Sequence, residues 1–198
     1  MKTTAIEPSP AMRRVLERQP WVEETGTRVV DATAEATGLP PGEADLVTWA
    51  QCFHWLDAPR ALAEAARILR PGGVAAAIWN QFDTNQPWVR RLTRIMRSGD
   101  VQERRRAPEF GAQFSEPHLT VTEWTDLQTS EQVLALARTR SSYLRSDAAG
   151  RAKMQANLHW YLYDHLGFYE GETIELPYRT SVWAAKNRGA SLTRRALP

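Results

Sequence analysis

The chain has 198 residues, 42% of them hydrophobic, which is enough to bury one sizeable core, so one domain is expected. The formal net charge of +2 is too small to indicate nucleic acid or another polyanion as a partner, and Arg104-Arg105-Arg106 is typical of a solvated loop. No apolar run approaches the roughly 18 residues of a membrane span, and residues 1–8 show no signal-peptide core. Cys52 is the only cysteine, which excludes an intrachain disulfide and fits a cytoplasmic location.

The first predicted elements alternate between short strands and a helix. A β-prone run at 3–6 is followed by Ser9 and Pro10, which suit the N-cap and the first position of a helix. A second short strand is predicted at 28–31. Residues 45–50 then form a mostly apolar strand, of the kind that is buried on both faces of a parallel sheet.

The next helix is predicted to begin at Asp57 and to carry Arg70 in its last turn, near the negative end of the helix dipole. The residues of its apolar stripe are Leu62, Ala65, Ala66 and Leu69. Pro71-Gly72-Gly73 is expected to stop the helix, and 74–79 is the next buried strand. This repeat of strands and helices predicts right-handed crossovers and a doubly wound sheet.

The second half of the chain changes character. A helix is predicted whose apolar side is Trp88, Val89, Leu92, Ile95 and Met96, and whose other side carries Arg90, Arg91, Arg94 and Arg97. A strand at 119–127 precedes a capping box of Thr129 and Gln132, which starts a helix through about Tyr143. A further helix contains Met154, Leu158, Tyr161 and Leu162 and ends at Gly167. Strict alternation over 174–184 predicts a last strand with one buried face.

The segment from Ala44 to Asn80 carries the most specific pattern of the chain. It contains Ala50-Gln51-Cys52-Phe53-His54-Trp55 after one strand and Leu69-Arg70-Pro71-Gly72-Gly73 before the next. It closely resembles the second half of the nucleotide-binding core of class I S-adenosylmethionine-dependent methyltransferases, and the resemblance extends over about 3–186. The family implies an α/β, Rossmann-like, doubly wound, mostly parallel sheet with strand order 3-2-1-4-5-7-6 and an antiparallel C-terminal edge.

The resemblance also implies a set of cofactor-binding residues. Glu7, at the C-terminal end of the first predicted strand, matches the acid that accepts both ribose hydroxyls of S-adenosylmethionine; a charge at a helix start is the alternative interpretation. Thr33 and Ala34 match the turn that meets the adenine, where a plain loop is the alternative. Gln51 matches the residue that lines the methionine end of the cofactor.

The catalytic residues stay open. The family places His54 beside the transfer point, where it would be either a general base or a structural imidazole that holds the following turn. The aromatic residues that would wall an acceptor, or simply pack in the core, are Phe82, Trp88, Tyr143, Trp160 and Tyr178. Metal ligation is not predicted, because the four histidines have no metal-binding spacing and one cysteine cannot build a zinc site.

The first half of the family's core is missing from the pattern. No two glycines lie two residues apart, so the Gly-rich loop that cradles the cofactor is absent, together with the first strand. We therefore expect a methyltransferase domain at 1–187 that is truncated before the second strand, and a flexible tail at 188–198. The expected function is methyl transfer to a small organic acceptor, impaired in this chain. The alternative is a non-catalytic remnant or interaction module of methyltransferase ancestry.

Overall fold

The computed structural model describes residues 2–97 and 107–189, so the arginine cluster at 104–106 and all but the first two residues of the predicted tail lie outside it. The chain forms two compact units. The first unit consists of residues 1–78, 107–119 and 182–198, and the second unit consists of residues 79–106 and 120–181. The predicted domain limits, 1–187, stay a prediction.

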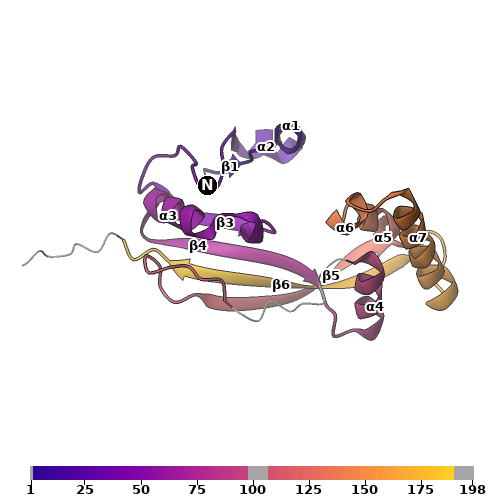
Figure 1. The fold of residues 1–198 in the computed structure, drawn as a ribbon. Helices are drawn as coiled ribbons and strands as arrows, with labels where there is room; N and C mark the ends of the chain where they lie inside the picture. Colours follow the sequence, from indigo (N-terminus) through magenta and orange to yellow (C-terminus); the bar gives the residue numbers. More distant parts are fainter. Residues whose placement is uncertain (1, 98–106, 190–198) are drawn as a thin grey trace, which may run out of the picture. The chain divides into compact units, whose positions relative to one another are not determined.

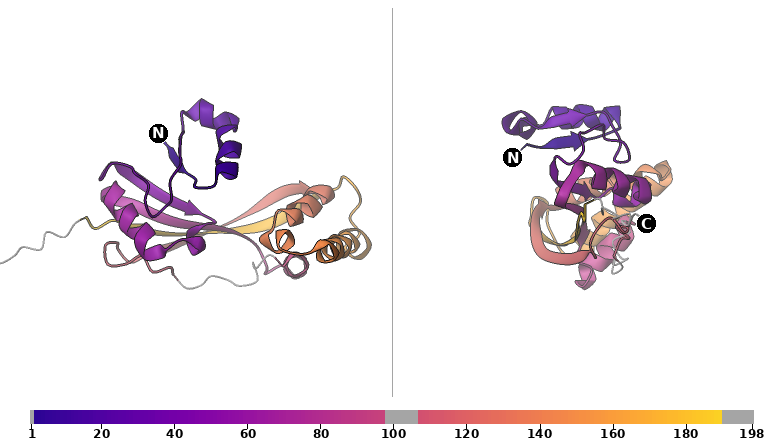
Figure 2. Two further views of the ribbon diagram at one scale, coloured as in Figure 1. Left: turned by 45° about the horizontal axis from the view of Figure 1, so that its top comes forward. Right: turned by 90° about the vertical axis from the view of Figure 1, so that its left-hand side faces the viewer.

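The N-terminal part of the first unit is a two-stranded parallel sheet with two helices beside it (Figure 2). Strand β1 (Thr4–Ile6) pairs with β2 (Arg28–Val30), and the intervening helices are α1 (Pro10–Glu17) and α2 (Pro20–Thr25). The Ser9 side chain accepts a hydrogen bond from the Met12 amide, which confirms the predicted N-cap.

The remaining strands form a separate four-stranded sheet with the order β3-β4-β6-β5 (Figure 1). Strand β3 (Ala44–Ala50) pairs in parallel with β4 (Leu69–Phe82), and α3 (Ala58–Ile68) connects them. Among the described residues, no strand pairs with both β1 and β3 and so joins the two sheets. The predicted separation of the first two strands from the next one is therefore confirmed, because the chain has two sheets instead of one.

The junction of α3 and β4 differs from the prediction. The helix ends at Ile68, so Arg70 and Pro71-Gly72-Gly73 belong to β4 and not to the helix end. The Gly72 amide donates to the Asn187 carbonyl, and the Asn187 amide donates to the Gly73 carbonyl, both at 2.8 Å. The local preferences of Pro71, Gly72 and Gly73 predict a turn. Backbone pairing with Asn187, more than a hundred residues later, instead makes this segment part of strand β4.

The C-terminal strands run antiparallel, as predicted. Near the start of β4, Gly72 and Gly73 pair with Asn187, which directly follows β6 (Thr173–Lys186). Just past the end of β4, the Asp83 amide donates to the Pro177 carbonyl of β6 at 2.9 Å. Strands β4 and β6 therefore run in opposite directions. Strand β5 (His118–Thr129) lies beside β6 and is antiparallel to it, since the Ser115 amide before β5 donates to the Lys186 carbonyl and the Ser130 amide after β5 donates to the Glu172 carbonyl. The sheet is thus mixed, with a parallel β3–β4 pair and an antiparallel edge, as expected of the fold class.

The second unit contains most of the fully buried side chains. Its helices are α4 (Pro87–Met96), α5 (Ser130–Arg138), α6 (Ser141–Leu144) and α7 (Ala148–His159), and α7 continues into a π-helical turn, η2 (Trp160–His165). The predicted capping box is present, but the helix that it starts breaks between α5 and α6. Fully buried core residues include Val89, Leu92, Met96, Val133, Leu158 and Leu162. Over the described residues, no helix has the length and apolarity that a membrane crossing requires.

Candidate functional site

Glu7 directly follows β1 and is half-buried. Its Oε1 accepts a hydrogen bond from the Ser9 amide at 2.8 Å, and its own carbonyl accepts from Arg13, which is paired with Asp31. Oε2 accepts no hydrogen bond from the described part of the chain. The carboxylate is therefore held in place by one oxygen while the other keeps its lone pairs for a ligand, so Glu7 both starts the following turn and suits a diol.

Thr33 and Ala34 lie in a tight turn that is closed by a hydrogen bond of 3.2 Å from the Ala36 amide to the Thr33 carbonyl. Glu35, in the same turn, accepts from the Asp57 amide at 3.1 Å. Burial alone would raise the pKa of Glu35, but its own amide, the Thr33 hydroxyl, the Asp57 amide and the charge of Arg60 together lower it. Glu35 thus ties the turn to the N-cap of α3, a role that the sequence did not reveal because the partner lies 22 residues away.

Gln51 leaves β3 in a strained backbone conformation. Its φ of 59° lies in the left-handed region, which among the described non-glycine residues only Arg97 shares. Its amide donates to the Ile78 carbonyl at 2.9 Å, so the turn is fixed to β4. Such a conformation costs on the order of 1 kcal/mol or more and is enriched at ligand-binding positions. The strain lies at the carboxyl end of a parallel strand, where open α/β sheets bind their ligands.

Cys52 directly follows Gln51, and the charge of Glu7 acts on its thiol. Burial raises the pKa of the Cys52 thiol, and the negative charge of Glu7 raises it further. The two residues are therefore electrostatic neighbours although 45 positions separate them. Glu35 connects the Thr33–Ala34 turn to Asp57, which lies six residues after Gln51 along the chain.

His54 lies in a short 3-10 helix, Phe53–Trp55, directly after this site. The ring of buried Phe53 packs 5.2 Å from Trp49 and 6.1 Å from Phe110, and this contact fixes the turn. His54 is exposed, and its ring lies 4.9 Å from that of Trp55, which is 70% exposed. The structure gives His54 an accessible ring beside a large aromatic surface, and both of its predicted roles stay open.

The aromatic residues predicted as an acceptor wall all belong to the second unit. Phe82 and Tyr178 pack with ring centroids 4.8 Å apart, and Trp124 stacks on Tyr178 at the same distance. Trp88 belongs to helix α4 and Trp160 to the π-helical turn η2. Within residues 2–97 and 107–189, no group of three or more potential metal ligands is present.

The loop after the Thr33–Ala34 turn is held by Glu64 of α3. Its carboxylate accepts from Arg67 Nε at 2.7 Å and from the Thr37 amide at 2.9 Å, and Arg67 also donates to the Leu39 carbonyl. These hydrogen bonds, first that from Arg67, lower the pKa of Glu64 from 4.5 to about 2 against the opposing effect of burial. The side chain of Glu64 is 11% exposed and that of Arg67 is 41% exposed, so solvent screens part of the attraction between the two charges.

The Glu64 pairing predicts an acid-dependent stability. The folded-state pKa lies below the unfolded value, so the stabilisation is complete above about pH 4.5 and is lost as the pH falls towards 2. In urea unfolding between these pH values, the Glu64→Gln variant should show a smaller decrease of unfolding free energy with acidification than the unchanged chain. Glu43→Gln, at an exposed position, is the control; equal pH slopes in all three proteins would contradict the prediction.

Comparisons with known proteins show the family and the fold of this chain. The family described as "Methyltransferase domain" matches residues 1–77. An uncharacterised methyltransferase of Mycobacterium tuberculosis is 34% identical over 182 residues, which cover 91% of this chain and 72% of that protein. An uncharacterised methyltransferase of Schizosaccharomyces pombe is 32% identical over 131 residues, covering 64% of this chain and 52% of that protein. A solved structure from Anaeromyxobacter dehalogenans, provisionally named a type II methyltransferase, matches with a TM-score of 0.65 and 25% identity over 94% of this chain and 80% of its own.

Proposed function

Since this chain belongs to the class I S-adenosylmethionine-dependent methyltransferases, we propose that it serves methyl transfer from S-adenosylmethionine to a small organic acceptor. The observations that support the proposal are the match of residues 1–77 to a methyltransferase domain, the position of Glu7 directly after β1, and the strained backbone of Gln51 directly after β3. These are the strand ends at which the fold binds its cofactor. A cytoplasmic location remains a prediction from the sequence.

The residues present fit an adenosine-containing cofactor. Glu7 has an oxygen available for the ribose hydroxyls, while its other oxygen is fixed by the Ser9 amide. The turn at Thr33 and Ala34 offers a hydroxyl and a backbone amide for the adenine, and Gln51 would meet the methionine end. When bound, S-adenosylmethionine supplies an electrophilic methyl group, so the chain has to align the acceptor and exclude water and needs no strong base.

A second function, a non-catalytic interaction module of methyltransferase ancestry, is favoured by one observation. The sequence contains no Gly-x-Gly, and the described residues place β1–β2 and β3–β4 in separate sheets. Backbone amides of a Gly-rich loop supply many of the contacts to such a cofactor. We therefore expect this 198-residue chain to bind S-adenosylmethionine more weakly than the micromolar range, which corresponds to about −8 kcal/mol.

Saturation-transfer NMR with S-adenosylhomocysteine tests the proposal, because this method detects weak ligands. Signals from the adenine and ribose protons that disappear on adding S-adenosylmethionine would support cofactor binding, whereas their absence at millimolar ligand would favour the interaction module. Calorimetric titration then gives the affinity. A micromolar dissociation constant would show that the remaining residues hold the cofactor without a Gly-rich loop.

A further inference from the structure

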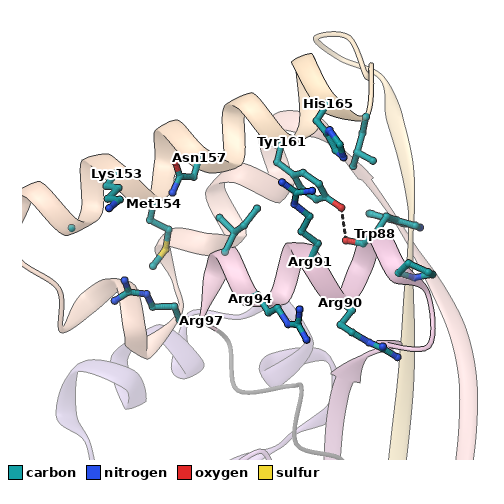
Figure 3. Close-up of a pocket in the computed structure, with 14 residues that line it drawn as sticks. Trp88, Arg90, Arg91, Arg94, Arg97, Lys153, Met154, Asn157, Tyr161 and His165 are labelled. Carbon is teal, nitrogen blue, oxygen red and sulfur yellow. Dashed lines mark hydrogen bonds between the residues drawn. The ribbon is translucent and has the colours of Figure 1, made fainter.

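The second unit contains a groove of about 1010 Å³ between α4 and the continuous helix formed by α7 and η2 (Figure 3). Its α4 side is lined by Trp88, Arg90, Arg91, Arg94, Ile95 and Arg97. The α7 side presents Gly150, Met154, Asn157, Tyr161 and His165 at intervals of three or four residues along one helix face, with Lys153 next to Met154. This α4–α7 groove contains none of the proposed cofactor-binding residues.

The groove is strongly cationic. Four arginines and Lys153 line it, and its described lining residues include no aspartate or glutamate. The side chains of Arg94, Arg97 and Lys153 are exposed and pair with no carboxylate among the described residues. Because the whole chain carries a net charge of only +2, this concentration of positive charge on one concave surface is a local feature.

Two of the arginines are held in position by neighbouring groups. Arg90 Nε donates to the Thr84 carbonyl at 2.9 Å, which leaves its two terminal nitrogens to bind other groups. The guanidinium of Arg91 lies 5.1 Å from the ring centroid of Tyr161 and 5.5 Å from that of Trp160. A guanidinium stacked on aromatic rings keeps its edge of N–H donors available, and this geometry suits a phosphate or carboxylate.

The floor of the groove is apolar and fixed. Met154 and Tyr161 are buried, and Trp88, Ile95 and Leu166 are partly buried and pack against the core. The Tyr161 hydroxyl donates to the Trp88 carbonyl at 2.9 Å and so joins η2 to α4. Burial raises the pKa of the Tyr161 phenol, partly opposed by Arg91, so the hydroxyl keeps its proton at neutral pH.

We infer that the α4–α7 groove binds a soluble small molecule with a phosphate or carboxylate head and an apolar body. The cations match the head, the floor matches the body, and the volume is that of a small-ligand site. A solvated basic helix face would explain the arginines of α4 alone. It does not explain why Lys153 and an apolar floor from a second helix complete a concave site around them. The inference is independent of methyl transfer and goes beyond it.

Calorimetric titration with octyl phosphate, kept below its micelle concentration, tests the inference, with inorganic phosphate as the second probe. The double variant Arg94→Gln/Lys153→Gln removes one exposed cation from each wall. We expect its affinity for octyl phosphate to fall at least about tenfold, because charge-assisted hydrogen bonds are lost. Arg18→Gln/Arg145→Gln removes the same charge at exposed positions outside the groove and should change the affinity by less than about twofold.

Three outcomes would overturn the inference. Equal losses in both double variants would mean that octyl phosphate responds only to the net charge. Equal affinities for inorganic and octyl phosphate would mean that the apolar floor takes no part, although burying an alkyl chain should tighten binding at least about tenfold. Binding to phosphatidylglycerol vesicles without binding to soluble octyl phosphate would identify a membrane surface as the partner. The single variant Arg94→Gln, at an exposed side chain, repeats the test if the double variant does not fold.

Discussion

Replacing Glu7 by alanine is expected to weaken the binding of S-adenosylmethionine by at least about tenfold, since charge-assisted hydrogen bonds to the ribose hydroxyls are worth about 1.5–3 kcal/mol each. Glu7 directly follows β1, is half-buried, and keeps Oε2 available while Oε1 accepts from the Ser9 amide. Folding should change little, because only that one local hydrogen bond is lost. Ligand titration followed by NMR gives the affinity, and urea unfolding gives the stability.

Glu24→Ala is the matched control, because it removes the same charge from an exposed position in the same unit. Its cofactor affinity should equal that of the unchanged chain. The Glu7→Gln variant keeps an acceptor without the charge and should lie between the two. If Glu7→Ala and Glu24→Ala bind S-adenosylmethionine equally well, Glu7 does not hold the ribose, and the assignment of the cofactor site to this strand end fails.

Replacing Asn187 by alanine should lower the free energy of unfolding by about 2–4 kcal/mol, because buried carbonyls lose their donor. Its side chain is buried at 5% exposure, and Nδ2 donates to the Ala66 carbonyl at 3.1 Å and to the Leu69 carbonyl at 3.0 Å. Its Oδ1 accepts from the Gly189 amide at 3.1 Å. One side chain therefore satisfies the end of α3 and the start of β4.

Urea unfolding of Asn187→Ala and Asn187→Asp tests this role. The aspartate variant should be at least as unstable as the alanine variant, since a carboxylate places negative charge against carbonyl oxygens and cannot donate to them. Asn85→Ala, at an exposed position, should change the unfolding free energy by less than about 0.5 kcal/mol. A loss of under about 1 kcal/mol for Asn187→Ala would show that water replaces the side chain at little cost.

Local interactions could be predicted from the sequence because their partners lie within a few residues. Ser9 caps α1 through the Met12 amide, and Thr129 and Gln132 exchange the hydrogen bonds of a capping box. A strand at 45–50 and an alternating last strand were predicted from the hydrophobic pattern, and both strands are present. The predicted burial of the first on both faces is wrong, because Leu46 is 52% exposed and Trp49 is the one buried residue of β3. In β6 the alternation holds from Ile174 to Tyr178, but towards the end of the strand Trp183 and Ala185 are buried instead of Val182 and Ala184. Glu7, Thr33, Ala34 and Gln51 were named from the resemblance to the family, and the structure places each of them at a strand end or in a turn.

Hydrogen bonds and packing between distant segments decided what the sequence pattern could not. The sequence predicted a turn at Pro71-Gly72-Gly73, but backbone pairing with Asn187 extends β4 through it. Glu35 accepts a hydrogen bond from the Asp57 amide, 22 residues later. The charge of Glu7, which is distant in the sequence, raises the pKa of the Cys52 thiol in addition to the effect of burial. From the sequence, the arginines of α4 were predicted only to form the polar side of a helix. In the structure, α7 forms the opposite wall of a groove that these arginines line. Each of these features depends on a free energy gained only when remote parts of the chain meet, and residue spacing along one element carries no information about it.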